Sequence, residues 1–167
     1  MVRIRQAGVP DAGVMTELRC AFLEEELGHS LPDGFADQLR GWIEEAALDG
    51  RLLFWLAELE GKVAGCVAVN PYPHMPSAYF SAGVGWYLLN MYVKPAYRRQ
   101  GVAAALLATV GAAAREYGVD AINLHATPEA HDLYERFGFT TSIDAMNLSL
   151  TVREEAPVER VAAGEGG

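Results

Sequence analysis

Apolar positions recur with two different periods along this chain, and the periods separate helices from strands. Val14, Leu18, Ala21 and Phe22 fall on one face when each residue turns by about 100°, which is typical of an amphipathic helix. Residues 51–59 and 62–70 are apolar on both alternating faces, which is typical of strands covered on both sides. The whole pattern predicts strands over residues 2–6, 51–59, 62–70, 84–93 and 120–126, one or two further strands within 139–151, and helices over residues 10–27, 35–48, 102–117 and 128–137.

Two connections stand out between these elements. Glu60-Gly61 separates two predicted strands by two residues, which favours a tight hairpin turn. Residues 71–83 hold three prolines and several aromatic residues, and a loop of this length is often functional. The segment fits a lid over a site, a surface excursion or a contact between two copies. Strands mixed with helices in this order predict an α/β fold.

Composition narrows the class of protein. The chain has 167 residues, close to the length of one domain, and its apolar fraction of 51% argues against disorder. A net charge of −9 argues against nucleic acid or an anionic membrane surface as the main partner. The first eleven residues lack the apolar stretch of a signal peptide, and the weakly apolar run 102–114 is too short to span a bilayer. We therefore expect a soluble cytoplasmic protein.

Cysteines and histidines give no metal signature. Cys20 and Cys66 lie 46 positions apart, so we expect small buried apolar side chains rather than a redox or metal pair. His29, His74 and His131 have no spacing typical of metal ligands, and no metal site is expected.

The stretch 90–104, NMYVKPAYRRQGVAA, carries the strongest chemical signal. A strand ends at Val93, Lys94-Pro95 breaks it, and a basic loop leads into a helix whose first residues are small. A helix N-terminus with close backbone access and two neighbouring arginines suits a phosphate or pyrophosphate, although a basic turn that only solvates the helix start fits as well. The chain has no G-x-x-x-x-G-K-[ST] loop, and Gly83-Val84-Gly85 lacks the third glycine of a dinucleotide fingerprint.

Residues 98–103, RRQGVA, match the [Q/R]-x-x-G-x-[G/A] signature, and here the sequence resembles the GNAT-type acetyl-CoA-dependent N-acetyltransferases. Residues 92–95 and 133–139 are similar to companion segments of the same superfamily, in the same order. The resemblance covers about residues 2–152 and leaves 153–167 as an expected flexible tail. It implies a single-domain fold with a mixed, mostly antiparallel twisted sheet of six or seven strands and helices on both faces.

The resemblance also implies an acetyl-CoA site. Met91 and Val93 would offer backbone groups to the thioester and the pantetheine arm, and Tyr134 would protonate the departing thiolate. A phenol suits that role chemically, because it can donate a proton to a sulfur whose parent pKa is about 8.5; packing in the core is the alternative role for Tyr134. The remaining cofactor-binding residues would be Arg98, Arg99, Gln100, Gly101, Val102, Ala103, Ala104 and Thr127.

Two departures from the family pattern leave the base open. Thr127 stands where many members have asparagine, and Tyr87 stands where some members have a glutamate base. An alkylammonium with a pKa of about 10.4 is neutral in roughly one part in 2,500 at pH 7, which adds about 4.6 kcal/mol to the barrier unless the site offsets it. Glu25, which continues the apolar helix face, His125, which ends a strand, and a chain of waters are the three candidates.

The resemblance implies an N-acetyltransferase that moves an acetyl group from acetyl-CoA to a primary amine by direct attack in a ternary complex. A catalytically silent acyl-CoA-binding regulatory module and a protein or peptide amine acetyltransferase are the alternatives. The acceptor, a small-molecule amine or a peptide, is not defined by the residues. Whether the chain forms a homodimer is equally open.

Overall fold

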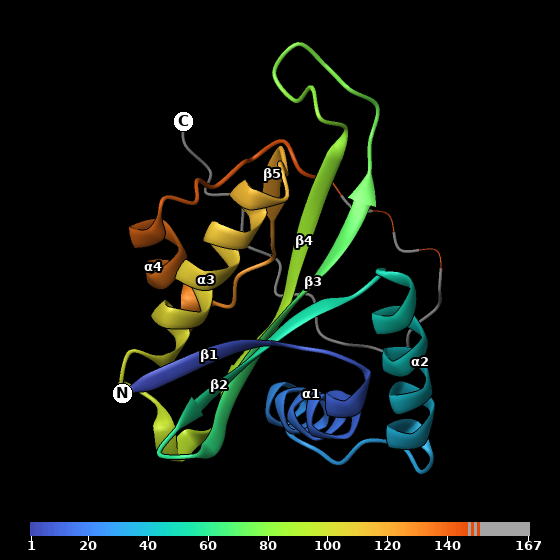
Figure 1. Cartoon of the computed structure of the whole chain (residues 1–167), viewed down its shortest axis with the longest axis vertical. Coiled ribbons are helices and arrows are strands. Elements are labelled where there is room, and N and C mark those ends of the chain that lie inside the picture. The colour runs from blue at the N-terminus through green and yellow to red at the C-terminus, as the bar shows by residue number, and fades with distance from the viewer. Residues whose placement is uncertain (147, 149, 151–167) are drawn as a thin grey trace, which may run out of the picture.

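The computed structural model describes residues 1–146, 148 and 150, and its centre is one five-stranded sheet. The strands lie in the order β1-β2-β3-β4-β5; the first four are antiparallel to their neighbours, and β5 runs parallel to β4. Figure 1 shows the sheet with its helices. The strands are β1 (Val2–Ala7), β2 (Leu53–Leu59), β3 (Lys62–Pro73), β4 (Val84–Val93) and β5 (Ala121–Asn123).

Helices cover both faces of the sheet, as the apolar pattern predicts. α1 (Ala12–Leu27) and α2 (Phe35–Asp49) pack on one face, where Leu18, Ile43 and Phe54 belong to one buried cluster. α3 (Val102–Glu116) packs on the other face, where Leu106 and Trp86 belong to a second cluster. α4 (Pro128–Phe137) follows β5, and short 3₁₀ turns, η1 (Val9–Asp11) and η2 (Pro95–Tyr97), precede α1 and α3. Both faces of the sheet are thus buried where the helices pack on them.

The predicted hairpin turn is confirmed at Glu60-Gly61. Leu59 pairs with Lys62, and both turn residues have positive φ, 52° and 75°. Positive φ at both central residues is the mark of a type I′ turn, whose twist matches that of antiparallel strands. Glycine at the second position removes the cost that a Cβ would add there.

The prediction of six or seven strands is wrong: the structure has five strands among its described residues. Residues 139–146, 148 and 150 contain no strand, and the rest of the predicted 139–151 segment lies outside the described residues. Met146, Leu148 and Leu150 alternate as a strand would, yet each is at least 81% exposed. Alternation is a local pattern, whereas a strand also needs a neighbouring edge, and the described part of this segment pairs with none. The predicted tail over 153–167 also lies outside the described residues.

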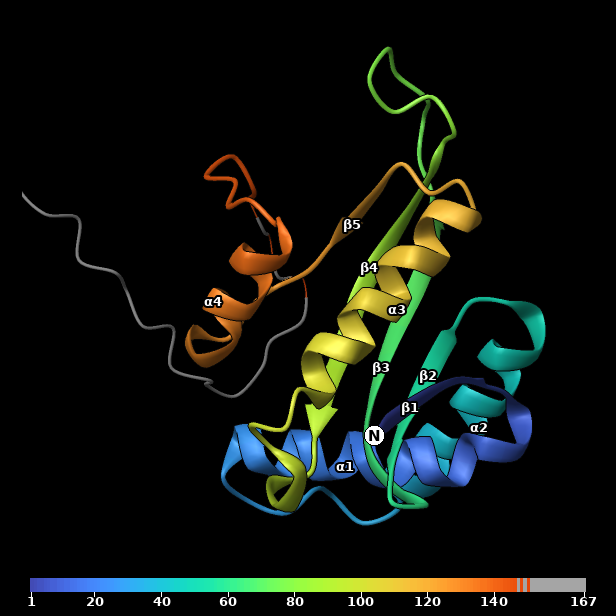
Figure 2. The same cartoon turned by 60° about the vertical axis from the view of Figure 1, so that its left-hand side comes forward.

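The segment after β3 is an extended hairpin rather than a loop from residue 71 onward. β3 continues to Pro73, and the remaining loop extends beyond the body of the molecule (Figures 1 and 2). Asp120, just before β5, anchors it, because its carboxylate accepts hydrogen bonds from the amides of Ala82 and Gly83 at 3.1 and 2.8 Å. Nε2 of His74 lies 3.1 Å from the same carboxylate. The loop lies at the end of β4 opposite the start of α3.

Cys66 is fully buried, as the sequence predicts, and Cys20 is partly buried; neither forms a disulfide. Among the helices that the structure describes, none is long and apolar enough to cross a membrane.

Candidate active site

The site begins where β4 and β5 separate. β5 pairs with β4 only at residues 85–87, through Gly85, Trp86 and Tyr87. From Leu88 to Val93, β4 keeps β3 on one side and has no strand on the other among the described residues. The separation leaves main-chain groups of β4 accessible beside α3 and α4, in the region that the resemblance assigns to the thioester.

A β-bulge at Asn90 changes the direction of β4 inside this gap. Ala68 pairs with Leu89 and Cys66 pairs with Tyr92, so β4 has one residue more than β3 between these pairs. Asn90 has a φ of 52° and is 3% exposed, and its Nδ2 donates to Sγ of Cys66 at 3.1 Å. After the bulge, Met91 and Val93 face the cleft. Sequence reasoning missed this bulge, although an asparagine inside a strand signals a left-handed position.

The start of α3 has the geometry expected for an anion site. Gly101 occupies the N-cap position with a φ of 79°, and Arg99 has a φ of 60°. The first helical hydrogen bond runs from the amide of Ala105 to the carbonyl of Gly101, so the amides of Val102, Ala103 and Ala104 have no partner within the helix. These amides and the positive end of the helix dipole favour a phosphate group. Gln100 turns away, and its side-chain amide donates to the carbonyl of Ala96.

Arg98 joins this loop to the end of α1. Its Nη2 donates to both carboxylate oxygens of Glu25 at 2.7 Å, and its Nε donates to the carbonyl of Val93 at 2.9 Å. The hydrogen bond from Arg98 holds the pKa of Glu25 below its usual value, and the same bond raises the pKa of Arg98. Both side chains are about half exposed, 41% for Arg98 and 47% for Glu25. Glu25 therefore continues the helix face in angle, but it is an ionised surface carboxylate paired with Arg98.

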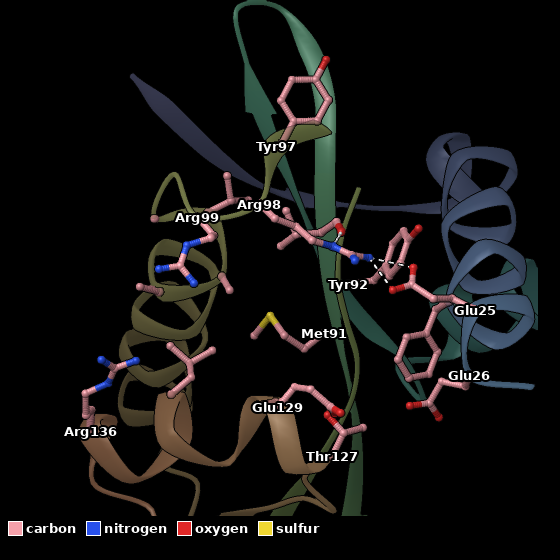
Figure 3. A pocket seen from close by; sticks show the side chains of 18 residues that line it. Glu25, Glu26, Met91, Tyr92, Tyr97, Arg98, Arg99, Thr127, Glu129 and Arg136 are labelled. Carbon is pink, nitrogen blue, oxygen red and sulfur yellow. Dashed lines mark hydrogen bonds and ion pairs between the residues drawn. The ribbon is translucent and has the colours of Figure 1, made fainter. Parts of the chain in front are cut away.

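A cleft of about 950 Å³ connects these features (Figure 3). Most of the predicted site residues line it, namely Glu25, Met91, Val93, Arg98, Arg99, Gly101, Val102, Ala103, Ala104 and Thr127. Gln100, His125 and Tyr134 do not belong to its lining. Residues that sequence reasoning did not assign also line it: Phe22, Glu26, Tyr92, Tyr97, Glu129, Ala130, Leu133 and Arg136.

Charges are separated across the cleft. Arg99 and Arg136 lie on the side formed by α3 and the end of α4, whereas Glu25 and Glu26 extend from α1 on the opposite side. Within the part of the chain that the structure describes, neither Arg99 nor Arg136 has a carboxylate within 4.0 Å. The first side therefore favours an anion. On the second side the charge of Glu25 is shared with Arg98, whereas Glu26 has no basic partner within 4.0 Å among the described residues and favours a cation. No local sequence motif could have predicted that Arg136 and Glu26 line opposite sides of one cleft, because their positions depend on how the helices pack.

Tyr134 lies in the core beside the cleft. It is 6% exposed and packs edge-on against Phe139, with ring centroids 5.5 Å apart. Burial raises the pKa of Tyr134 to about 12. Ala130 and Leu133, on the same helix, line the cleft, and Thr127 occupies the N-cap of α4 at its lower edge.

His125 lies outside the cleft and forms a hydrogen bond between its Nδ1 and the hydroxyl of Tyr87. The two rings are 5.7 Å apart, and both residues lie where β4 and β5 begin to separate. The structure thus joins a candidate base to the residue that stands at the family's glutamate position. Spacing in the sequence gave no sign of this pair, because 38 residues separate its members.

One group of metal-ligating side chains comes together in the described chain. Ligand atoms of His131, Asp132 and Glu135 on α4 lie within 4.8 Å of one another. His131 Nε2 already lies 3.3 Å from the hydroxyl of Thr141, and the two carboxylates are exposed. Exposed carboxylates on one helix turn are common without an ion, and the prediction that there is no metal site stays a prediction.

Comparison with known proteins identifies the class. The sequence model of the acetyltransferase (GNAT) family matches residues 14–139, so the chain belongs to the GNAT family of acetyltransferases. A comparison with curated proteins gave no significant match.

Solved structures agree in fold. A predicted acetyltransferase with acetyl-CoA from Clostridium acetobutylicum is 23% identical, with a TM-score of 0.80 over 90% of this chain and 97% of that one. A GCN5-related N-acetyltransferase from Ralstonia eutropha is also 23% identical, with a TM-score of 0.75 over 89% and 99%. An aminoglycoside N-acetyltransferase in complex with CoA is 19% identical, with a TM-score of 0.70 over 89% and 94%. The predicted GNAT-type α/β fold is confirmed.

Proposed function

We propose that this protein transfers the acetyl group of acetyl-CoA to a primary amine by direct attack in a ternary complex. The separation of charge across the cleft carries the proposal. An anionic coenzyme suits the side with the α3 N-terminus, Arg99 and Arg136, and an ammonium suits the side with Glu25 and Glu26. Met91, beside the bulge, lies between the two sides.

The residues present fit coenzyme A. The amides of residues 102–104 offer a phosphate cradle, and no heavy atom other than chain neighbours lies within 4 Å of a Cβ built at Gly101, so the approach is open. A cleft of about 950 Å³ has room for an extended arm and an acceptor. When bound, acetyl-CoA supplies the acetyl group as an activated thioester. Met91 and Val93 would orient the arm through main-chain groups, and Tyr134 would hold a proton at its Oη for the departing sulfur.

The Tyr87–His125 pair is the route we propose for the acceptor's proton. Tyr87 would give its hydroxyl proton to Nδ1 of His125 and take one from the ammonium, so the amine becomes neutral and the phenol is restored. Because neither residue lines the cleft, water would link the ammonium to the hydroxyl of Tyr87. Glu25 is suited to binding instead, because its carboxylate favours the ammonium form, which strengthens binding but opposes deprotonation. Glu25 would therefore bind and orient the acceptor. A chain of waters is the remaining alternative for the base.

The proposed activity is tested by incubating the protein with acetyl-CoA and a panel of alkyl amines, polyamines, amino acids and peptides. Release of free thiol together with an acetylated product, identified by mass, is the expected result. Binding of acetyl-CoA without turnover on any acceptor would contradict the proposal and favour a silent acyl-CoA-binding module.

Replacing His125 by glutamine is expected to lower kcat about tenfold at pH 7. We expect less than the ~10²-fold typical of a general base, because water can take the proton in its place. The loss should shrink between pH 7 and pH 10, since more of the amine is already neutral as the pH approaches its pKa of about 10.4. Steady-state kinetics over this range measures both effects. His29→Gln, on an exposed residue, is the matched control, and an equal loss at every pH would contradict a role as base.

Replacing Glu25 by glutamine is expected to raise KM for a cationic acceptor about fivefold and to change kcat less. The physical reason is that Glu25→Gln leaves the guanidinium of Arg98 without its partner, so a net positive charge faces the ammonium. An exposed charge of this kind is worth about 1 kcal/mol. Acetyl-CoA affinity should stay within about threefold. Initial-rate kinetics and calorimetric titration give the two values. Glu17→Gln, on the same helix and also exposed, should leave KM unchanged; unaltered acceptor kinetics in Glu25→Gln would overturn the assignment.

A further inference from the structure

Arg19 places a positive charge on α1 beside Phe22, a residue that lines the cleft. Its Nη1 donates to Oδ1 of Asn90 at 3.2 Å, and its guanidinium carbon lies 5.5 Å from the centre of the Phe22 ring. Phe22 lines the cleft, and Asn90 forms the bulge directly before Met91. The guanidinium therefore contacts the residue that precedes Met91, whose main chain would orient the acetyl donor.

Arg19 lacks the carboxylate partner that several other arginines of the chain have. Arg5, Arg40, Arg51 and Arg98 each form an ion pair with an aspartate or glutamate. Among the described residues, no carboxylate oxygen lies within 4.0 Å of Arg19. A guanidinium has five N–H donors, and one of them has a side-chain partner here.

Partial burial makes that charge costly. Arg19 is only partly exposed, and burial lowers the pKa of its guanidinium, with Glu26 as the main opposing influence. A cation that is withdrawn from water without an anion loses hydration that a single amide oxygen does not replace. The ring of Phe22 offsets part of this cost. The remaining N–H donors match the two oxygens of a carboxylate, which arginine binds in a fork.

We propose that Arg19 binds a carboxylate of the acceptor, so that the acceptor is an amine that also carries a carboxylate, such as an amino acid. The inference rests on the proposed function and specifies its substrate class. Arg19, Phe22 and Glu26 lie at i, i+3 and i+7 on α1, hence on one face of the helix. The carboxylate of the acceptor would meet the guanidinium of Arg19, and its apolar part would lie against Phe22.

A structural role for Arg19 makes a different prediction. If Arg19 only holds Asn90 in the bulge, its loss weakens acetylation of every acceptor alike. If Arg19 binds the acceptor, its loss acts only on acceptors that carry a carboxylate. Matched pairs that differ in this group alone separate the two roles.

The test measures kcat/KM for amino acids and short peptides, each as the free carboxylate and as its carboxamide, with alkyl diamines as carboxylate-free amines. The wild-type protein should prefer the carboxylate member of the best pair by at least about tenfold, the value of a hydrogen-bonded charge pair. Arg19→Gln should reduce that preference to about twofold or less, mainly through KM, and keep the coenzyme A affinity of the wild type. Arg19→Lys keeps the positive charge but loses the forked guanidinium, so this variant should retain part of the preference for the carboxylate.

Arg3→Gln, which removes an exposed charge on β1, is the matched control and should retain the full preference. Equal use of carboxylate and carboxamide by the wild type, or acetylation of diamines alone, overturns this inference and leaves the proposed function standing. The inference also fails if Arg19→Gln slows all acceptors equally. Absence of acetylation across the whole panel overturns the proposed function together with it.

Discussion

Gly101→Asp is expected to weaken coenzyme A binding by more than about a hundredfold. The substitution would place a carboxylate at the N-terminus of α3, where the amides of Val102, Ala103 and Ala104 would otherwise receive a phosphate. Two like charges about 5 Å apart at an effective dielectric constant of about 20 repel by about 3 kcal/mol, which is more than a hundredfold in affinity. Calorimetric titration with coenzyme A measures the loss.

The fold should tolerate this change, so loss of binding is separable from loss of structure. No heavy atom beyond chain neighbours lies within 4 Å of a Cβ at Gly101, and aspartate is a favourable residue at the start of a helix. The φ of 79° at Gly101 costs asparagine about as much as aspartate, and asparagine has the same shape without the charge. Gly101→Asn is therefore the control and should lose only a few-fold. Wild-type affinity in a folded Gly101→Asp protein would show that the phosphates bind elsewhere.

Tyr134→Phe is expected to lower kcat by about a hundredfold while coenzyme A affinity stays within a few-fold. The ring packs against Phe139 in the core, so phenylalanine keeps the contact and removes only the hydroxyl that would protonate the sulfur. Single-turnover rates at saturating acceptor report this step. Tyr117→Phe, at an exposed tyrosine at the end of α3, is the matched control.

The pKa of about 12 gives this role a clear pH signature. The acid must be protonated, and a raised pKa extends the protonated range upward, so Tyr134 keeps its proton throughout assays below about pH 10. The kcat profile of the wild type should therefore show no alkaline loss from this group. Unchanged turnover in Tyr134→Phe would make Tyr134 a packing residue. The proton for the departing sulfur would then come from water or from another group.

Local features of this chain were predictable, and pairings over long separations were not. The start of α3 follows from residues 98–104 alone, because a turn residue, small side chains and a helix start are consecutive in the chain. The contacts Arg19–Asn90, Glu25–Arg98 and Tyr87–His125 join positions 71, 73 and 38 residues apart. They depend on how α1 crosses the sheet and where β5 leaves β4, which no periodicity in the sequence encodes.

Burial was harder to predict than secondary structure. Glu26, which falls off the apolar face of α1 in angle, nevertheless lines the cleft, because the end of the helix borders open space rather than the core. The prediction of one or two strands within 139–151 failed, although Met146, Leu148 and Leu150 alternate as strand residues would, whereas the strands predicted over 51–59 and 62–70 are present as β2 and β3. β2 and β3 each pair with neighbouring strands, and the described residues of 139–151 pair with none.

The extra residue at Asn90 acts as a change of phase within β4. Before Asn90, the even-numbered residues Trp86 and Leu88 face α3. After Asn90, the odd-numbered residues Met91 and Val93 face α3. If Asn90 were a regular position of the strand instead of a bulge, Met91 and Val93 would face α1 and Tyr92 would face the coenzyme side. A single unpaired position thus lets one continuous strand serve the core in its first half and the reaction cleft in its second.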